Sequence, residues 1–425
     1  MSRHATTQHF DKLSTSQKPR NLETQKHRNL ETKNIETIMN YLSPSTPLPK
    51  ITGSLISYFS NMVKLNGGTN LAQGIPGFRP PEKLLEIFSQ ILQKDIHQYA
   101  PGCGNKKLLE HLDAKYSNRP STARIFISSG ATEAVSLIYT YLQGNKGKNF
   151  NAMSFSPAYE SYIHLPQIFG NNFFTYPTDP EIYFDNEDFR KFFVENKINV
   201  IFVASPGNPY GKTLSREKLD YLIDLCEEFG SYLIIDSVYC ELYFNNEPPY
   251  YPIERISPNV FYVNSFSKRF SITGWRVGYF IFDESHFDKI SYIHDYIGLS
   301  SAAPQQQAIA EFLDTNESRT CITELRNKIL HNLAIGNERL QKAGFVCPQN
   351  DGGYFIWAKL PEPWNDSLRF GLALYDEVRT AVIPGVHFGK EWNNYIRINI
   401  AREEDEFIRG INNLIEFTKR AKAQH

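Results

Sequence analysis

The sequence of 425 residues predicts an α/β fold built on a mostly parallel sheet. Short, continuous apolar runs alternate with longer stretches of helical character, and several of the runs end in a polar or glycine-bearing motif. Continuous apolar strands between helices are typical of a parallel sheet that helices cover on both faces. Ligands of such sheets bind beyond the carboxyl ends of the strands, so we expect functional residues there.

Strand and helix signals alternate along the middle of the chain. A strand over Arg124–Ser128 is followed by a helix over Ala131–Leu142. The same signals predict further strands and a further helix, namely strands over Val200–Ala204, Tyr232–Asp236, Val260–Asn264 and Arg276–Phe282 and a helix over Arg216–Phe229. This order of elements indicates a layered α/β domain.

The chain is too long for one small core, so we expect two domains, or one large domain and a smaller one. The first forty or so residues are polar, and the motif Arg20–Thr24 recurs as Arg28–Thr32. Such a segment buries too little surface to offset the entropy lost on ordering, so residues 1–40 are predicted to be a disordered tail. An organelle transit peptide is the alternative, and acidic residues such as Asp11 and Glu23 disfavour it.

Composition excludes several classes of protein. The formal net charge is -1, which gives no reason to expect a nucleic-acid partner or an acidic lipid surface. The 5 cysteines form no C-x-x-C pair, so a reducing, cytoplasmic location is expected. We find no apolar run of bilayer length, no signal peptide and no histidine spacing of a metal site, and therefore predict neither a membrane segment nor a bound metal.

The motif Ser128–Glu133 joins a predicted strand to a predicted helix through Gly130. The free amides and the positive dipole end of such a helix suit a phosphate group. A plain tight turn is the alternative, because the same arrangement of strand, glycine and helix occurs in any fold of this class.

Two further motifs stand at strand ends. Asn208, in Ala204–Gly211, follows the strand that begins at Val200, and its amide would donate to a ligand oxygen; a surface turn is the alternative. Asp236 ends the next strand, where a buried acid is costly without a cationic partner such as a protonated ring nitrogen. Its alternative role is to cap a helix.

The motif with the most chemical content runs from Asn264 to Gly278 and contains Lys268 between Ser265, Ser267 and Arg276. A lysine amine is a nucleophile when burial or cationic neighbours lower its pKa. An arginine binds phosphate through two parallel hydrogen bonds. The alternative is a solvated surface lysine, which the neighbouring hydroxyl and apolar residues disfavour.

Taken together, these motifs resemble those of the class I/II aminotransferases, which are fold-type I pyridoxal-phosphate enzymes. The family's Ser-x-Ser-Lys and Gly-Trp-Arg-x-Gly match Ser265–Gly278, its Asn-Pro-x-Gly matches Asn208–Gly211, and its Asp-x-x-Tyr matches Asp236–Tyr239. The matches keep the family's order from about Leu71 to Ala401. The resemblance implies a large domain with a mostly parallel seven-stranded sheet, over residues 94–303. It also implies a smaller α+β domain that combines residues 41–93 with residues 304–425.

The resemblance also implies roles for single residues. Lys268 would be the Schiff-base lysine, which then moves a proton between the substrate α-carbon and the cofactor C4′. Asp236 would bind the ring nitrogen and keep the ring an electron sink, while Asn208 and Tyr239 bind the phenolic oxygen. Arg397, in Tyr395–Asn399, would bind the substrate α-carboxylate, with a sheet-edge salt bridge as the alternative.

The rest of the implied site concerns the cofactor ring, its phosphate and the neighbouring subunit. Tyr159 would stack on the ring, with core packing as its alternative. The phosphate would be held by Gly130, Ala131, Thr132, Ser265, Ser267 and Arg276. Gly74, in Asn70–Phe78, would cover the substrate carboxylate, although Gly77 stands where the family often has Asp. Tyr99, in Gln98–Gly102, would reach the phosphate of a neighbouring subunit, which implies a homodimer with shared active sites.

Within the family, the motifs around Gly74 and Tyr99 are most similar to the kynurenine, glutamine-phenylpyruvate and methionine aminotransferase branch. The implied reaction is ping-pong transfer of an amino group to a 2-oxo acid, from a donor with a large uncharged, aromatic or sulfur-containing side chain. His387 stands where the family commonly has a small residue, and it is a candidate for lining the pocket. The alternatives are a pyridoxal-phosphate carbon–sulfur β-lyase, which needs the same residues, and a non-catalytic relative that only binds the cofactor.

Overall fold

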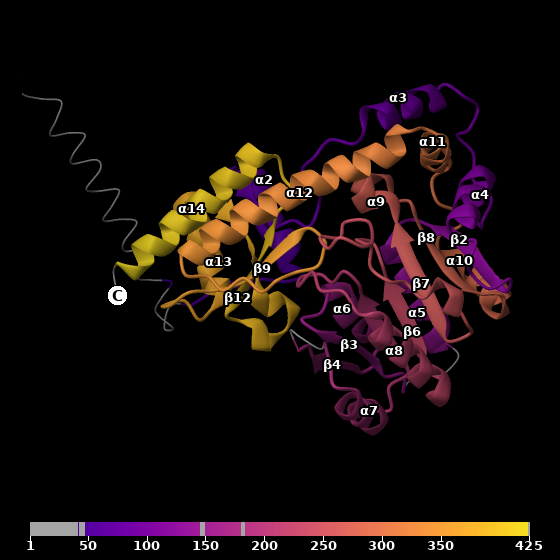
Figure 1. Cartoon of the computed structure of the whole chain (residues 1–425), viewed down its shortest axis with the longest axis horizontal. Helices are drawn as coiled ribbons and strands as arrows, with labels where there is room; N and C mark the ends of the chain where they lie inside the picture. The colour runs from indigo at the N-terminus through magenta and orange to yellow at the C-terminus, as the bar shows by residue number, and fades with distance from the viewer. Residues whose placement is uncertain (1–40, 42–46, 145–148, 180–182, 424–425) are drawn as a thin grey trace, which may run out of the picture.

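The computed structural model describes residues 41, 47–144, 149–179 and 183–423, so the tail predicted for residues 1–40 lies outside the described residues. Its largest sheet has seven strands, in the order β2 (Ala123–Ser128), β8 (Gly278–Asp283), β7 (Val260–Ser265), β6 (Tyr232–Asp236), β5 (Val200–Ala204), β3 (Ala152–Ser156) and β4 (Phe173–Pro177) (Figure 1). Strands β3 to β7 pair in parallel, and β8 runs antiparallel to both β7 and β2. The expectation of a mostly parallel sheet is confirmed.

Two differences from the predicted strands have local causes. The strand predicted from Arg276 begins only at Gly278, because Arg276 has a left-handed backbone with φ 56° that no extended strand tolerates. Strands β3 and β4 were not predicted. β3 contains Ser154 and Ser156, and β4 is an edge strand with half-buried side chains, so neither has a purely apolar sequence.

Alternate side chains of the strands enter two apolar cores, one on each face of the sheet. On one face Ile201 and Val203 pack with α3 (Glu82–Ile91), α4 (Lys106–Lys115), α7 (Asn186–Glu195), α8 (Arg216–Phe229) and α11 (Ala303–Leu313). On the other face Phe202 packs with α5 (Ala131–Gly144), α6 (Glu160–Ile168) and α10 (Phe287–Ile297). The sheet is therefore covered on both sides, as its continuous apolar strands predict.

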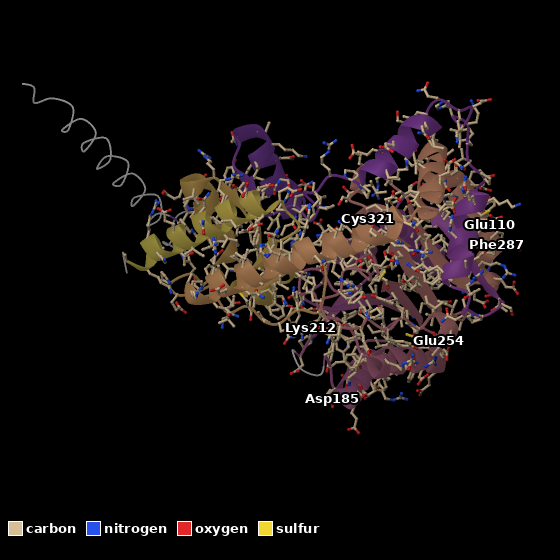
Figure 2. All side chains as sticks on the ribbon, turned by 45° about the horizontal axis from the view of Figure 1, so that its top comes forward. Glu110, Asp185, Lys212, Glu254, Phe287 and Cys321 are labelled. Atoms are coloured by element: carbon tan, nitrogen blue, oxygen red, sulfur yellow. The ribbon has the colours of Figure 1, made fainter. Side chains whose placement is uncertain are left out.

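Capping residues explain why some helix bounds are legible in the sequence. The side chain of Ser215 accepts a hydrogen bond from the Lys218 amide at the start of α8, and Gly230 ends that helix with a left-handed φ of 62°. Asp185 caps α7 in the same way at the surface of the molecule, where it accepts hydrogen bonds from the amides of Glu187 and Asp188 (Figure 2).

A smaller, second region is built from both ends of the described chain. Strands β11 (Ile383–Pro384), β12 (Tyr395–Asn399) and β9 (Phe355–Lys359) form an antiparallel sheet, and β1 (Thr69–Asn70) pairs in parallel with β10 (Thr380–Ala381). Its helices are α2 (Leu55–Asn66), α13 (Ser367–Val378) and α14 (Glu404–Lys422). The long helix α12 (Glu317–Lys342) runs from α11, beside the large sheet, to α13 and α14 beside the small one (Figure 1).

The described part of the chain also contains short elements, namely α9 (Phe266–Arg269) and the 3-10 helices η1 (Ile253–Arg255), η2 (Thr273–Trp275), η3 (Glu284–His286), η4 (Gly385–Phe388) and η5 (Lys390–Trp392). The domain boundaries given above stay predictions. Leu84 of α3 and Ile309 of α11 both belong to the core of the large sheet, which favours counting these two helices with the large domain. No helix in the described part of the chain combines the length and the apolar character that a membrane span requires.

Candidate active site

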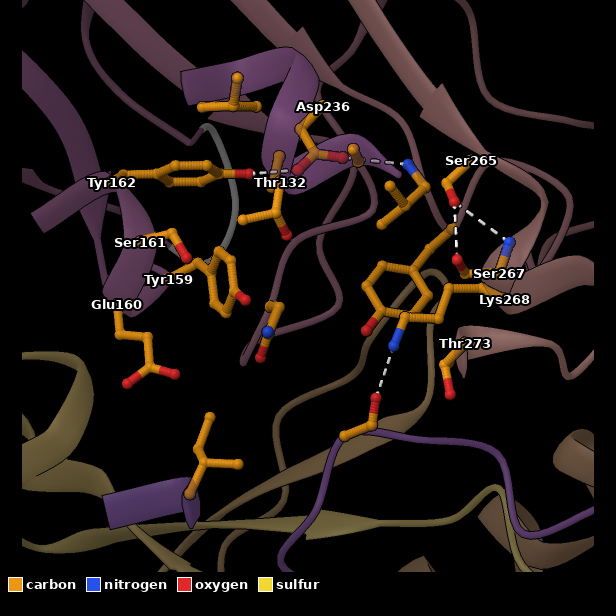
Figure 3. A pocket seen from close by; sticks show the side chains of 18 of the residues that line it. Thr132, Tyr159, Glu160, Ser161, Tyr162, Asp236, Ser265, Ser267, Lys268 and Thr273 are labelled. Atoms are coloured by element: carbon orange, nitrogen blue, oxygen red, sulfur yellow. Dashed lines mark hydrogen bonds between the residues drawn. The ribbon is translucent and has the colours of Figure 1, made fainter. Parts of the chain in front are cut away.

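A cavity of about 270 Å³ opens at the carboxyl ends of β5, β6 and β7, and it collects most of the predicted site residues (Figure 3). Those that line it are Gly74, Ala131, Thr132, Tyr159, Asn208, Asp236, Tyr239, Ser265, Ser267, Lys268, Arg276 and Arg397. Gly130 and Tyr99 are not among the lining residues. Gly130 lies directly beneath the Arg276 guanidinium, whereas Tyr99 is 81% exposed.

Lys268 stands on α9, the one-turn helix that follows β7. Ser265 caps this helix by accepting a hydrogen bond from the Ser267 amide, which fixes the direction in which Lys268 leaves the sheet. Lys268 Nζ donates to the carbonyl of Gly74 at 2.6 Å, and the Tyr354 hydroxyl donates to the Lys268 carbonyl. Burial is the largest cause that lowers the pKa of Lys268 to about 8, with the Arg397 and Arg276 charges adding to it and Asp236 opposing them.

Asp236 lies at the end of β6 with its carboxylate buried. The Tyr162 hydroxyl donates to Asp236 Oδ2 at 2.7 Å, and the Val238 amide donates to Oδ1 at 3.1 Å. Burial raises the pKa of Asp236, and these two hydrogen bonds and the Lys268 charge partly oppose that rise. The described residues after Asp236 form turns and no helix begins there, so Asp236 is not a helix cap.

The structure adds Tyr162, which sequence reasoning did not single out. Its ring stacks on Phe202 of β5 with the ring centroids 5.2 Å apart, so the hydroxyl points at Asp236 from a fixed position. A signal was present in the sequence. Tyr162 follows Tyr159 by three residues, a spacing that puts two residues on the same face when a helix forms.

A cradle for an anion lies where β2 turns into α5. Arg276 Nη2 donates to the Ser129 carbonyl at 2.9 Å. Gly130 has φ +83°, and a Cβ at that position would collide with the Arg276 guanidinium, while a Cβ at Gly278 would approach the Gly130 carbonyl carbon to 2.7 Å. Both glycines are therefore needed for the arginine to lie against the start of α5. The dipole of α5 and this guanidinium together favour a phosphate.

Arg397 of β12 is fully buried and lines the same cavity. Its Nη1 donates to Asn208 Oδ1 at 2.9 Å and its Nη2 to the Ala72 carbonyl at 2.7 Å, so both bonds go to amide oxygens rather than to a salt-bridge partner. Its guanidinium carbon lies 4.2 Å above the centre of the Phe355 ring. Burial lowers the pKa of Arg397 to about 10, which marks a desolvated cation suited to a carboxylate ligand.

The described residues fit pyridoxal phosphate, the cofactor that the resemblance implies. A partly buried amine with a lowered pKa suits an aldehyde, the cradle at Gly130 suits a phosphate ester, and the buried Asp236 carboxylate suits a protonated ring nitrogen. Tyr159 lies beside these groups, at the start of α6 (Figure 3).

The outer wall of the cavity holds a second residue that the sequence did not reveal. Glu160 lines the cavity, and His387 does not. His387 Nε2 instead lies 3.0 Å from Glu160 Oε2, with the histidine side chain only 6% exposed. His387, which was expected to line the pocket, thus lies behind Glu160.

Comparisons with known proteins agree with this geometry. The family model for class I and II aminotransferases matches residues 66–413. The aspartate aminotransferase of Pyrococcus horikoshii is 25% identical over 84% of this chain and 92% of its own length, and the aromatic aminotransferase ISS1 of Arabidopsis thaliana is 27% identical over 80% and 86%. The crystal structure of an aromatic aminotransferase from Pyrococcus horikoshii superposes with a TM-score of 0.77 at 24% identity, over 86% of this chain and 99% of that one. The fold is that of the fold-type I enzymes.

Proposed function

The chain belongs to the family of class I and II aminotransferases, which use pyridoxal phosphate, and we propose that it moves an amino group from an amino acid with a large uncharged side chain to a 2-oxo acid. One observation carries the proposal. Lys268, Asp236 and Arg397 come from α9, β6 and β12 and line the same cavity. A cavity lined by an amine, an acid and a buried cation has the groups that amino-group transfer requires.

We propose the following holders for the cofactor, which when bound supplies an electron sink for the substrate α-carbon. Asp236 binds the ring nitrogen, and Tyr159 stacks on the ring. Asn208 and Tyr239 bind the phenolic oxygen. The phosphate is bound by Arg276, by the hydroxyls of Ser265 and Ser267 and by the start of α5 at Gly130, Ala131 and Thr132.

In this proposal Lys268 handles the proton of the reaction. Its Nζ atom is held 2.6 Å from the Gly74 carbonyl, so the amine is aimed at the middle of the cavity rather than at solvent. With a pKa of about 8, about a tenth of the amine is neutral at pH 7, far more than in an ordinary lysine, and that neutral form is able to take the proton from the substrate α-carbon. The hydrogen bond from Tyr354 to the Lys268 carbonyl restrains the backbone while that proton moves.

Arg397 binds the α-carboxylate in this proposal, and Asn208 orients it. Because Arg397 Nη1 already donates to Asn208, the guanidinium plane is fixed before a ligand arrives. Little conformational entropy is then lost on binding. Gly74 lies against the Phe355 ring, and a Cβ added at Gly74 would be 3.6 Å from Arg397 Nη2. Because glycine has no Cβ, this space beneath the backbone stays open for the carboxylate.

The preference for a large uncharged, aromatic or sulfur-containing side chain has two supports. Apolar side chains of Ile56, Val135 and Leu165 form part of the cavity wall. The Arabidopsis relative is named for aromatic substrates. Relatives named for aspartate weigh against the preference and make the acidic amino acids the necessary comparison.

We also propose a cytoplasmic homodimer. The loop that carries Tyr99 lies against the end of α10, since a Cβ on Gly102 would be 3.5 Å from Asp295 Oδ1. Tyr99, Tyr292 and Tyr296 are all largely exposed there, with 81%, 66% and 78% of their surface accessible. Large exposed aromatic side chains are typical of protein interfaces. Tyr99 would then complete the phosphate site of the second subunit.

A spectroscopic screen tests the proposed function. Purified protein loaded with pyridoxal phosphate is mixed with single amino acids, and conversion to the pyridoxamine form is followed by the loss of the visible absorption of the pyridoxal form. Conversion by aromatic and sulfur-containing amino acids, and reversal by 2-oxo acids, is the expected result. Release of ammonia and pyruvate from a cysteine conjugate without an oxo acid would favour the β-lyase instead. A protein that binds the cofactor and converts no amino acid would contradict both.

A further inference from the structure

A carboxylate forms part of the cavity wall on the side away from Lys268. Glu160 is the first residue of α6 and follows Tyr159 directly. Figure 3 shows Glu160, at the start of α6, and Tyr159, just before it, across the open cavity from Lys268. The roles proposed above do not use Glu160, although a fixed charge at this position faces any ligand that enters.

Two neighbouring side chains act on the Glu160 carboxylate. His387 Nε2 of η4 lies 3.0 Å from Oε2, and hydrogen bonding by Ser54 helps to lower the pKa of Glu160. Ser54 in turn caps α2, the helix that contributes Ile56 to the same cavity wall. The Glu160 side chain keeps 19% of its surface accessible, so it is neither sealed in the interior nor free in solvent.

The surroundings hold Glu160 in its ionised form. Burial raises the pKa of Glu160, but the hydrogen bonds from His387 and Ser54 and the charges of His387 and Arg397 outweigh burial and leave the pKa below its ordinary value. A carboxylate has about four acceptor positions, so two contacts leave acceptor capacity for a ligand. The wall therefore offers a fixed negative charge that still accepts hydrogen bonds.

We propose that Glu160 selects the substrate side chain, favouring side chains that end in a hydrogen-bond donor and rejecting those that end in a carboxylate. This inference rests on the proposed function, which assigns Arg397 to the α-carboxylate. With that end of the substrate fixed at Arg397, the side chain extends into the part of the cavity that Glu160 lines. A second carboxylate placed there meets a like charge in a partly desolvated site, whereas an amide, indole or hydroxyl donor gains a charge-assisted hydrogen bond.

Glutamine and glutamate form a matched pair for the test, because they have nearly the same shape and differ in the terminal group. The loaded enzyme should convert glutamine with a kcat/KM at least about tenfold above that for glutamate. In Glu160→Gln the ratio should fall about tenfold or more, mainly because glutamate improves. Glu160→Val should also lower the ratio, because it removes both the charge and the acceptor. Glu195→Gln, at the exposed end of α7, should leave the ratio unchanged.

A binding measurement separates this inference from the proposed function. Glutarate and its monoamide, glutaramate, lack an amino group and do not react, so calorimetry on the loaded enzyme gives their dissociation constants without catalysis. Glutaramate should bind at least about tenfold more tightly than glutarate, and Glu160→Gln should remove most of that difference. Equal binding of the two acids, or a preference unchanged in Glu160→Gln, overturns the inference. If no amino acid converts the cofactor but the difference in binding is lost in Glu160→Gln, the proposed reaction is refuted and the inference about Glu160 is supported.

Discussion

Removing the Tyr162 hydroxyl tests how the cavity keeps Asp236 ionised. The hydroxyl donates to Asp236 Oδ2 at 2.7 Å from a side chain that is only 2% exposed. In Tyr162→Phe the ring still fills its place against Phe202, 5.2 Å between centroids, so the change deletes one hydrogen bond and little packing. Burial already raises the pKa of Asp236, and the Tyr162 hydrogen bond is the largest effect that opposes it. The pKa of Asp236 should therefore rise in the variant.

The size of the effect follows from the charge on the acceptor. A hydrogen bond to a charged group contributes about 1.5–3 kcal/mol, roughly twice a neutral one. In Tyr162→Phe the ionised form of Asp236 loses this stabilisation. The acid dissociation constant of Asp236 should therefore fall by about 10- to 150-fold. Because the ionised acid is proposed to bind the ring nitrogen, cofactor affinity and kcat/KM should each fall by a factor within that range at mildly acidic pH.

The assay is the pH profile of kcat/KM together with the dissociation constant of pyridoxal phosphate. The acidic limb of the profile should move to higher pH in Tyr162→Phe, since protonation of Asp236 becomes easier. Tyr139→Phe is the matched control, because Tyr139 is fully buried, accepts a hydrogen bond from Asn171 at 2.9 Å and does not line the cavity. An acidic limb that stays in place in Tyr162→Phe, or that moves equally in Tyr139→Phe, would refute the reasoning.

Three further predictions concern Lys268 and Arg397. Lys268→Ala should abolish both activity and the yellow absorption band of the cofactor bonded to the lysine, and an unaltered spectrum would contradict the assignment of Lys268. Arg397→Ala should weaken binding of an unreactive carboxylate by about 2–5 kcal/mol, as calorimetry measures it, because a desolvated charge pair is lost; unchanged binding would remove Arg397 from the site. Since the pKa of Lys268 is lowered to about 8, the cofactor-free protein should capture pyridoxal phosphate faster as the pH rises to about 8 and then level off. Stopped-flow absorbance measures this rate, and a rate still climbing toward pH 10 would show that the amine is not desolvated.

The elements that the sequence predicted well are those whose signals are local. Strands β5 and β6 have continuous apolar sequences, and their bounds are those predicted. Strand β3 was missed because its hydroxyls are satisfied by distant partners: Ser154 Oγ donates to the Phe202 carbonyl at 2.9 Å, and Ser156 Oγ accepts from Trp392 Nε1 at 2.8 Å. Before the fold is known, two serines in five residues are more typical of a loop than of a buried strand.

The same distinction separates the site residues that were predicted from those that were not. Lys268 and Asp236 stand in motifs whose neighbours are close in sequence, so the chemistry of each could be read from a few residues. The importance of Tyr162 and Glu160 depends on contacts with Asp236, Ser54 and His387, which other elements bring to α6. The sequence of α6 alone does not indicate those partners.

The low pKa of Lys268 couples protonation of its amine to the binding of anions at two arginines. Apart from burial, the charges that lower it are those of Arg397 and Arg276, the two cations proposed to bind the substrate carboxylate and the phosphate. An anion bound at either arginine cancels part of the positive potential at Nζ, so each anion that binds favours a proton on the lysine. Linkage makes this reciprocal, so a protonated Lys268 binds those anions more tightly than a neutral one. The arginines therefore increase the neutral fraction of the amine while the cavity is empty of anions, and their effect weakens when the carboxylate is in place and a proton has to be taken up.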